Sequence, residues 1–306
     1  MEKAKENLKL QDSDMKDIKN NYYASLKDES FKIMVSKLDT SDEVKMKYTS
    51  SLMDAAYEFG HCMNCPGLSE CQNKIKGFMY TPVATDKSIS FEYKACRYKN
   101  KELLDNKYLE NIELFDMTAS LKNASIKEMY TNDKERLDII KYFKKFIDNY
   151  GKNKVKGLYL HGSFGTGKTY LIAALFNEMA KRDVKSAIVY YPEFLRSLKE
   201  SFECGYKEKF NYIRKIPLLL IDDIGAETVT GWSRDEILGS ILQYRMEEGL
   251  PTFFTSNLTI DELEEHLSIS NKGVEKVKAR RIIERIKYIT EDLKLVSVDR
   301  RNKSVK

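Results

Sequence analysis

Short apolar runs alternate with amphipathic segments through the second half of the chain. The runs carry leucine, isoleucine, valine and aromatic residues and read as buried strands, whereas the segments between them carry apolar residues at helical spacing. Strand-like runs occupy residues 156–161, 186–191, 216–221 and 252–256, and helix-like segments occupy residues 134–147, 170–180, 192–201, 233–247 and most of 260–287. A last strand-like run ends at Val298. Alternating strands and helices predict an α/β domain, a parallel sheet with helices on both faces.

The first hundred residues have a different pattern. They are rich in lysine and acidic residues, with apolar positions at helical spacing that predict helices over 29–36 and 41–59. Residues 88–93 alternate polar and apolar side chains, which is typical of a short strand. Residues 101–131 are polar, and we interpret them as a linker with a partner-dependent helix. The pattern thus predicts a small helical domain at 1–100, a linker at 101–131 and an α/β domain at 132–306.

Composition narrows the class of protein. Of the 306 residues, 42% are hydrophobic and 32% charged, which suits a soluble chain with a sizeable core. No run approaches the roughly 20 apolar residues of a membrane span, and the polar N-terminus lacks a signal core. We therefore expect a cytoplasmic protein without membrane contact. A net charge of +5 permits nucleic-acid binding without requiring it.

A glycine-rich loop lies between the first strand-like run and the following helix. It fits G-x-x-x-x-G-K-[ST], the phosphate-binding loop of nucleoside triphosphatases. Its members, all candidate ATP contacts, are Gly162, Ser163, Phe164, Gly165, Thr166, Gly167, Lys168 and Thr169. Glycines let backbone N–H groups turn toward phosphates, the lysine reaches the β- and γ-phosphates, and the threonine hydroxyl ligates Mg²⁺. The order strand, loop, helix favours this interpretation over a chance glycine-rich turn.

Two carboxylates close a later apolar run. Asp222 and Asp223 follow Leu218–Ile221, the arrangement of a Walker B strand. We expect Asp222 to hold Mg²⁺ and Asp223 to orient or deprotonate the attacking water; the alternative is a buried strand that ends in an acidic turn. Asn257 ends the next strand and is our candidate for a hydrogen bond to that water or to the γ-phosphate, although asparagine also forms turns at such positions.

Arginines cluster near the C-terminus. Arg281 and Arg285 are four residues apart and share a helix face, so either can reach a neighbouring subunit's γ-phosphate. The alternative is a solvated basic face paired with Glu284. Arg300 and Arg301 form a second pair, which fits either a nucleotide contact within the same chain or a basic tail.

Four of the five cysteines crowd into one segment. Cys62, Cys65, Cys71 and Cys96 suit a structural Zn²⁺ site, because thiolates bind zinc tetrahedrally and Cys-x₂-Cys offers two sulfurs at once. Buried free thiols are the alternative. His61 is a rival ligand, but its adjacency to Cys62 makes joint ligation awkward. The fifth cysteine, Cys204, is expected to be unliganded.

Together these motifs resemble the AAA+ ATPase domain of bacterial helicase loaders of the DnaI and DnaC type. The resemblance rests on residues 162–169, Leu219–Gly225, Thr255–Asn257, Arg280–Ile286 and the stretch 232–257, and it extends to the cysteines. It implies that Lys168 and Thr169 are the Walker A pair, Asp222 and Asp223 Walker B, Asn257 sensor 1 and Arg285 the arginine finger. Sensor 2 is then Arg300 or Arg301.

The resemblance also implies a function. Such loaders bind the hexameric replicative helicase through the N-terminal domain and deliver it to single-stranded DNA, with ATP, Mg²⁺, a zinc-binding domain and AAA+ self-association. Many AAA+ proteins carry Asp-Glu at Walker B, whereas Asp222-Asp223 predicts slow hydrolysis and an ATP switch. Family members can use a histidine zinc ligand, but this chain has none between residues 62 and 160, which favours Cys96. The rivals are an IstB-like AAA+ helper of DNA transposition and a zinc adaptor with an inert ATPase half.

Aromatic and basic residues mix after the second strand of the α/β domain. Single-strand binders combine basic grooves with aromatic platforms, and core packing explains such aromatics equally well. The residues are Tyr190, Tyr191, Phe194, Arg196, Lys199, Phe202, Tyr206, Lys207 and Lys209.

Overall fold

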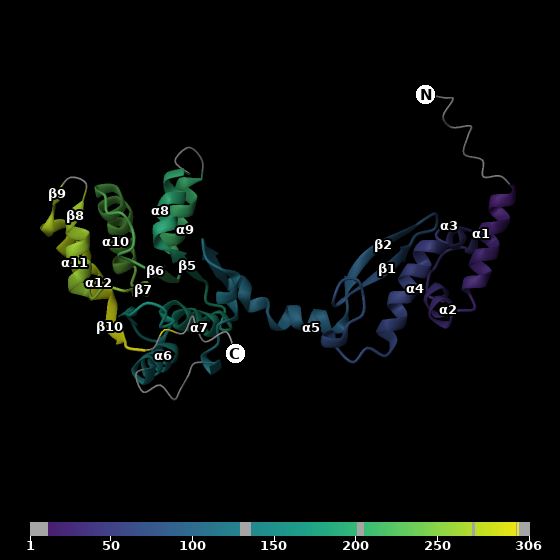
Figure 1. Ribbon diagram of the computed structural model, residues 1–306, viewed down its shortest axis with the longest axis horizontal. Helices are drawn as coiled ribbons and strands as arrows, with labels where there is room; N and C mark the ends of the chain where they lie inside the picture. The colour runs from purple at the N-terminus through teal and green to yellow at the C-terminus, as the bar shows by residue number, and fades with distance from the viewer. Residues whose placement is uncertain (1–11, 129–135, 201–204, 271–272, 298, 300–306) are drawn as a thin grey trace, which may run out of the picture. The chain divides into compact units, whose positions relative to one another are not determined.

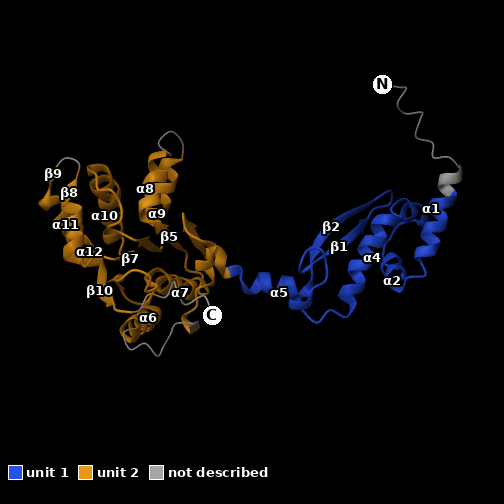
Figure 2. Ribbon diagram, viewed as in Figure 1, with its two compact units in different colours: residues 1–107 blue, residues 108–306 orange. Residues whose placement is uncertain are grey.

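The computed structural model describes residues 12–128, 136–200, 205–270, 273–297 and 299 (Figure 1). Its contacts divide the chain into two units, residues 1–107 and 108–306 (Figure 2). Strand β3, Ile112–Phe115, pairs with strand β5 of the second unit. Part of the segment interpreted above as a linker is therefore a strand of the main sheet.

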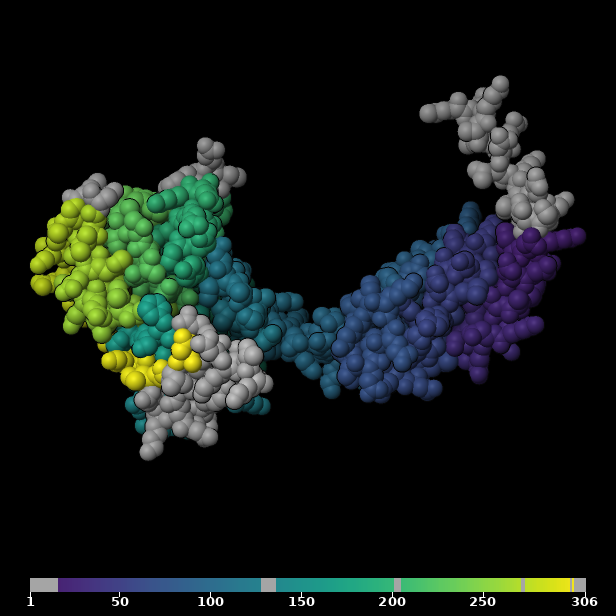
Figure 3. Space-filling view, viewed as in Figure 1, coloured from purple at the N-terminus to yellow at the C-terminus, as the bar shows by residue number. Residues whose placement is uncertain are grey.

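The second unit is built on a six-stranded parallel sheet. The strands lie in the order β10-β4-β7-β6-β5-β3, and each neighbouring pair runs parallel. Their bounds are Ile112–Phe115 for β3, Gly157–Gly162 for β4, Ser186–Tyr190 for β5, Leu218–Asp222 for β6, Thr252–Ser256 for β7 and Thr290–Leu295 for β10. In the space-filling view, yellow C-terminal residues lie beside teal ones (Figure 3), as the β10–β4 pairing requires.

Side chains of successive residues in each strand point to opposite faces of the sheet and pack into two hydrophobic cores. Leu218 and Leu220 of β6 pack on one face, while Leu219 and Ile221 pack on the other. Helices α6, Leu137–Asn149, and α7, Lys168–Ala180, cover the first face. The second is covered by α8, Tyr191–Glu200, α9, Tyr206–Lys215, α10, Gly239–Glu247, α11, Ile260–Ser268, and α12, Lys276–Ile289. The predicted parallel sheet with helices on both faces is confirmed.

Two predicted helices are interrupted. The helix expected over 233–247 starts as a π-helix, Trp232–Leu238, which continues into α10. The buried Arg234 in that turn donates to the carbonyl of Leu267 at 3.0 Å and to the Glu275 carboxylate at 2.8 Å. Between α11 and α12, strands β8, Ile269–Ser270, and β9, Gly273–Val274, pair antiparallel. Arg234 thus ties the irregular turn to both sides of the second interruption.

The first unit combines helices with one hairpin. Its helices are α1, Asp12–Ser25, α2, Glu29–Ser36, α3, Asp42–Lys47, α4, Thr49–Met63, and α5, Arg97–Asp105; strands β1, Phe78–Ala84, and β2, Ile89–Ala95, form the hairpin. The helix predicted over 29–36 is confirmed. The one predicted over 41–59 is divided, because Tyr48 leaves the helical conformation at φ −113° between α3 and α4.

A buried carboxylate joins helix and hairpin in this unit. Glu58 of α4 accepts the N–H of Tyr80 at 2.7 Å and the N–H of Lys74 at 3.3 Å. Because both donors lie beyond the turn that contains Cys65 and Cys71, Glu58 fixes the cysteine-bearing segment against α4.

Short 3₁₀ helices connect these elements. They are Leu68–Glu70, Lys107–Asn111, Ala119–Asn123 and Ile126–Glu128. The buried Asn177 of α7 donates to the carbonyls of Leu121, Lys122 and Ala124 and holds the segment after β3 on that helix. Among the described helices, none has the length and apolar character needed to cross a bilayer.

Candidate nucleotide site

The glycine-rich loop joins the end of β4 to the first turn of α7. Gly162 has φ +148°, and a Cβ there would lie 2.1 Å from the Leu295 carbonyl oxygen. Gly167, with φ +87°, is in the left-handed region and immediately precedes the helix. Only glycine fits both conditions without strain. The loop thus brings its backbone N–H groups to a helix N-terminus, where an anion is favoured.

Lys168 lies within the cradle of the loop. Its Nζ donates to the carbonyls of Gly162 at 2.8 Å and Ser163 at 3.0 Å, and to Asn257 Oδ1 at 2.8 Å. The residue as a whole is only 8% exposed. The ammonium is thus fixed between the loop and the end of β7, and it lies where phosphate oxygens can compete for its protons.

Two hydroxyl groups hold the first Walker B carboxylate. Asp222 Oδ1 accepts from Thr169 Oγ1 at 2.6 Å and from Thr255 Oγ1 at 2.6 Å. Burial raises the pKa of Asp222, and the two hydroxyl donors oppose that rise. A hydroxyl and a carboxylate side by side are the hard oxygen donors that Mg²⁺ prefers, and a cation would further favour the ionised carboxylate. Thr169 and Asp222 therefore fit the Mg²⁺ expected from sequence.

The second carboxylate is held in a strained turn. Asp223 has φ +56°, a conformation that costs a non-glycine residue free energy and is common at functional sites. Its N–H donates to Thr255 Oγ1 at 2.9 Å, and its Oδ1 accepts from Asn257 Nδ2 at 3.1 Å. Burial raises the pKa of Asp223, and the Lys168 ammonium opposes the rise. Asn257 thus connects the loop lysine to Asp223.

Sequence reasoning missed two residues that support this site. Thr255 donates to Asp222 and accepts from the Asp223 N–H, so one hydroxyl positions both carboxylates. Thr255 lies near the end of β7, two residues before Asn257, and this closeness to a predicted site residue is the sequence signal that could have identified it. Arg136 is buried and donates to the Thr166 carbonyl at 2.8 Å, but no local pattern marks an arginine so far from the loop in sequence.

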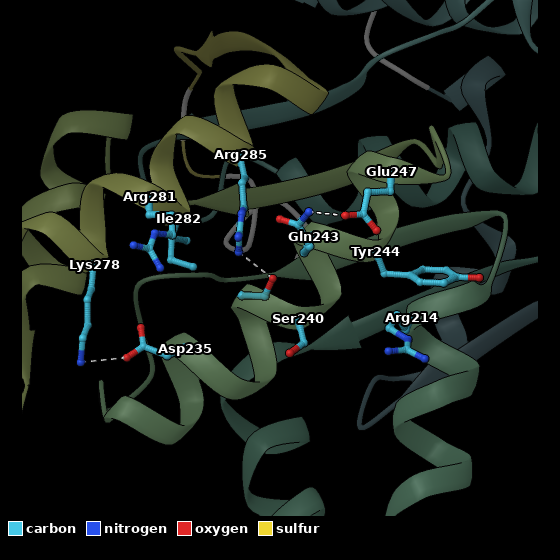
Figure 4. A pocket seen from close by; sticks show the side chains of 11 residues that line it. Arg214, Asp235, Ser240, Gln243, Tyr244, Glu247, Lys278, Arg281, Ile282 and Arg285 are labelled. Carbon is cyan, nitrogen blue, oxygen red and sulfur yellow. Dashed lines mark hydrogen bonds and ion pairs between the residues drawn. The ribbon is translucent and has the colours of Figure 1, made fainter.

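The predicted arginine finger, Arg285, lies away from the glycine-rich loop, in another part of the second unit. Arg281 and Arg285 line a cavity of about 520 Å³ together with residues of α9, the π-helix and α10 (Figure 4). Arg285 donates to the Gly239 carbonyl at 2.9 Å, whereas Arg281 is exposed. Burial and the neighbouring Arg281 lower the pKa of Arg285. None of the described lining residues belongs to the glycine-rich loop, and Arg300 and Arg301 lie outside the described residues.

The aromatic platform proposed for single-stranded DNA is only partly available. Tyr191 and Phe194 are each 1% exposed and belong to the hydrophobic core, so for these two residues the structure favours the core-packing alternative over base stacking. They are core residues because α8 turns them toward the sheet. Arg196 and Lys199 of the same helix are exposed. Phe202 and Cys204 lie outside the described residues.

The four clustered cysteines line one cavity of about 440 Å³ in the first unit. Cys71 Sγ accepts the N–H of Gly77 at 3.3 Å, and Cys62 Sγ accepts from Asn73 Nδ2 at 3.3 Å. All are free thiols, and burial raises the pKa of Cys62. Within the described ranges, no three His, Cys, Asp or Glu side chains form a group that holds a metal ion. Four thiols are nevertheless the donor type that zinc prefers.

The rival zinc ligand has other neighbours. The His61 ring packs edge-on against Tyr57, with 4.4 Å between the centroids. His61 lines a different cavity, which it shares with residues of α2 and α4.

Comparison with known proteins identifies relatives for both units. Residues 141–273 match the family model described as the bacterial DnaA ATPase domain. The chain is 36% identical over 271 residues to the replicative helicase loader DnaI of Bacillus subtilis, an alignment that covers 86% of this chain and 87% of DnaI. It is 24% identical over 145 residues to the Escherichia coli replicative helicase loader DnaC, covering 46% of this chain and 58% of DnaC.

Solved structures of DnaI and DnaC also match this chain. A crystal structure of DnaI matches with a TM-score of 0.57 and 45% identity, covering 64% of this chain and 100% of that one. The crystal structure of the DnaC helicase loader matches with a TM-score of 0.51 and 21% identity, covering 58% of this chain and 100% of that one, and supports the fold alone.

Proposed function

The chain belongs to the DnaI family of replicative helicase loaders, and we propose that it binds a hexameric replicative helicase and delivers it to single-stranded DNA under the control of ATP. The observation that carries this proposal is the extent of the likeness to DnaI, which spans both units instead of the ATPase unit alone. An IstB-like helper of transposition shares the ATPase motifs, but no observation on this chain favours it. A pull-down of the helicase by the full chain tests the proposal; absence of binding contradicts it.

The nucleotide site supports ATP as the controlling ligand. Lys168 neutralises phosphate charge at the helix N-terminus, and Thr169 with Asp222 provides the oxygens that hold Mg²⁺. When bound, Mg²⁺ supplies positive charge at the phosphate oxygens. Asp223 accepts a proton from water or orients it for attack on the γ-phosphorus, and Asn257 holds the Asp223 carboxylate for that role.

We propose that hydrolysis is slow and that ATP acts as a switch. Asp223 is one methylene shorter than the glutamate that many AAA+ proteins carry at this position. The shorter side chain is farther from the water that it must activate. An inert ATPase half does not explain why Lys168, Asn257 and Asp223 are connected.

The remaining roles concern partners. Arg281 and Arg285 lie away from their own loop, which supports a contact with the nucleotide of a neighbouring copy and hence self-association. Arg196, which pairs with Glu193 at 3.1 Å, and Lys199, which lies over the Trp232 ring, are exposed basic groups that support a contact with a DNA backbone. Arg300 or Arg301 remains the candidate for sensor 2.

We also propose that the first unit binds zinc through Cys62, Cys65, Cys71 and Cys96, a structural role without an open coordination position. Protein purified with zinc in the medium is expected to carry one equivalent by elemental analysis. Replacing Cys62 and Cys65 with serine removes thiolate ligands, so the variant is expected to lose the metal and to melt at lower temperature. Cys204→Ser is the matched control. Zinc-free wild-type protein, or full zinc content in the double variant, contradicts the proposal.

A further inference from the structure

We propose that a groove between α2 and α4 in the first unit binds an amphipathic helical segment of the replicative helicase that carries basic residues beside its apolar stripe. This inference rests on the proposed function and names the surface that would perform the docking. Ser25, at the end of α1, closes one side of the groove.

The outer face of α4 exposes large apolar side chains. Met53 is 51% exposed and Tyr57 is 70% exposed, and they lie one helical turn apart on the same face. Leu52 and Ala55 of the same helix are fully buried in the core of the unit, so a different face of α4 supplies the stability of the fold. Tyrosine and methionine are enriched at protein interfaces, and tyrosine at the residues that dominate binding. We therefore infer that this face of α4 binds a partner protein.

A cavity lies beside this face. It has a volume of about 520 Å³ and is lined from α2 by Ser30 and Phe31 and from α4 by Met53, Tyr57 and Gly60, among others. The two helices approach closely at Gly60, where an added Cβ would lie only 2.9 Å from Ser30 Oγ. Pockets of about 300–1,000 Å³ accommodate whole apolar groups, so the groove can receive side chains from a helix laid along α4.

The charges around the groove select a basic partner. Asp28 and Asp54 are the formally charged residues among the described lining residues, and both are exposed acids. Carboxylates at a rim attract lysine and arginine and repel phosphate. A nucleic acid is therefore disfavoured here, although the whole chain is basic.

One buried polar atom in the groove has no partner. His61 Nδ1 is buried without a hydrogen-bond partner in the described part of the chain, while the ring packs against Tyr57. An unsatisfied buried nitrogen costs free energy that a partner's hydrogen bond can recover. The exposed apolar side chains, the two acidic residues and the unsatisfied His61 nitrogen thus lie on the same surface.

The test compares full-length variants for binding to the purified hexameric helicase by interferometry. The double variant Met53→Ala with Tyr57→Ala is expected to raise Kd about tenfold or more, because truncation of central interface residues has effects of this size. Leu103→Ala with Leu104→Ala, whose side chains are 51% and 71% exposed on α5, is the matched control and is expected to leave Kd within about twofold. Asp54→Lys is expected to weaken binding and to flatten its salt dependence.

The outcomes separate this inference from the function on which it rests. If the wild-type chain does not bind the helicase, the proposed function fails. If the wild type binds and the Met53/Tyr57 variant binds equally well, the groove is not the docking surface and the proposed function stands. If the variant loses only self-association in light scattering, the groove holds a second copy of the chain, which also overturns the inference. Circular dichroism confirms that each variant is folded.

Discussion

Replacing Lys168 with alanine is expected to weaken ATP binding by about 100-fold and to abolish hydrolysis. The change removes the lysine ammonium of the phosphate loop, and with it the donor to Gly162 O, Ser163 O and Asn257 Oδ1. A hydrogen bond to a charged group contributes about 1.5–3 kcal/mol, which by itself accounts for a loss of this order. Titration with a fluorescent ATP analogue, or calorimetry, measures the effect.

The control for this variant lies at the opposite end of the same helix. Lys181 follows α7 and pairs with Glu178 at 3.0 Å on the surface, so Lys181→Ala is expected to bind ATP as the wild type does. Binding of the helicase in the absence of nucleotide reports whether the Lys168 variant keeps its first unit intact. Unchanged ATP affinity in Lys168→Ala overturns the nucleotide site.

Replacing Asp223 with asparagine is expected to lower the ATP turnover number by about 100-fold or more while ATP affinity changes little. The reason is that a general base contributes about 10²–10⁴-fold to rate, whereas Asp222 and Thr169 keep the Mg²⁺ oxygens in place. Asp223→Glu is the complementary variant. Its longer side chain reaches farther toward water, so its turnover is expected to exceed that of the wild type.

Steady-state phosphate release gives the ATP turnover number of both Asp223 variants, and their ATP affinity is determined in a separate titration. Asp223→Asn with wild-type turnover shows that another group activates the water. A wild-type turnover typical of a processive motor removes the basis for the switch, and so does an Asp223→Glu variant slower than the wild type.

Local chemistry made much of the nucleotide site predictable. The loop from Gly162 to Thr169 and the pair Asp222-Asp223 each have a residue pattern that one phosphate-binding geometry requires. Buried parallel strands are continuous apolar runs, so the strands that carry these residues were also visible. The expected companion Asn257 lies next to both Lys168 and Asp223 in the structure.

Features that depend on distant residues were not predictable. Strand β3 is only Ile112–Phe115, and what makes it a strand is its pairing with β5, far along the chain. Tyr191 and Phe194 show the same limit, because composition cannot distinguish an aromatic core from an aromatic platform. Arg136 reaches the loop through tertiary packing, and the cavity around Arg285 is assembled from α9, α10 and α12.

Helicase transfer to a closed circle of single-stranded DNA tests the central claim most directly. A ring-shaped hexamer cannot thread onto DNA without ends, so DNA-bound helicase, separated by gel filtration and quantified, reports loading. The account predicts that helicase with the wild-type chain and ATP accumulates on the circle, and that the Lys168→Ala chain reduces this accumulation strongly. Equal amounts of DNA-bound helicase with and without the wild-type chain contradict the assignment of this protein as a loader.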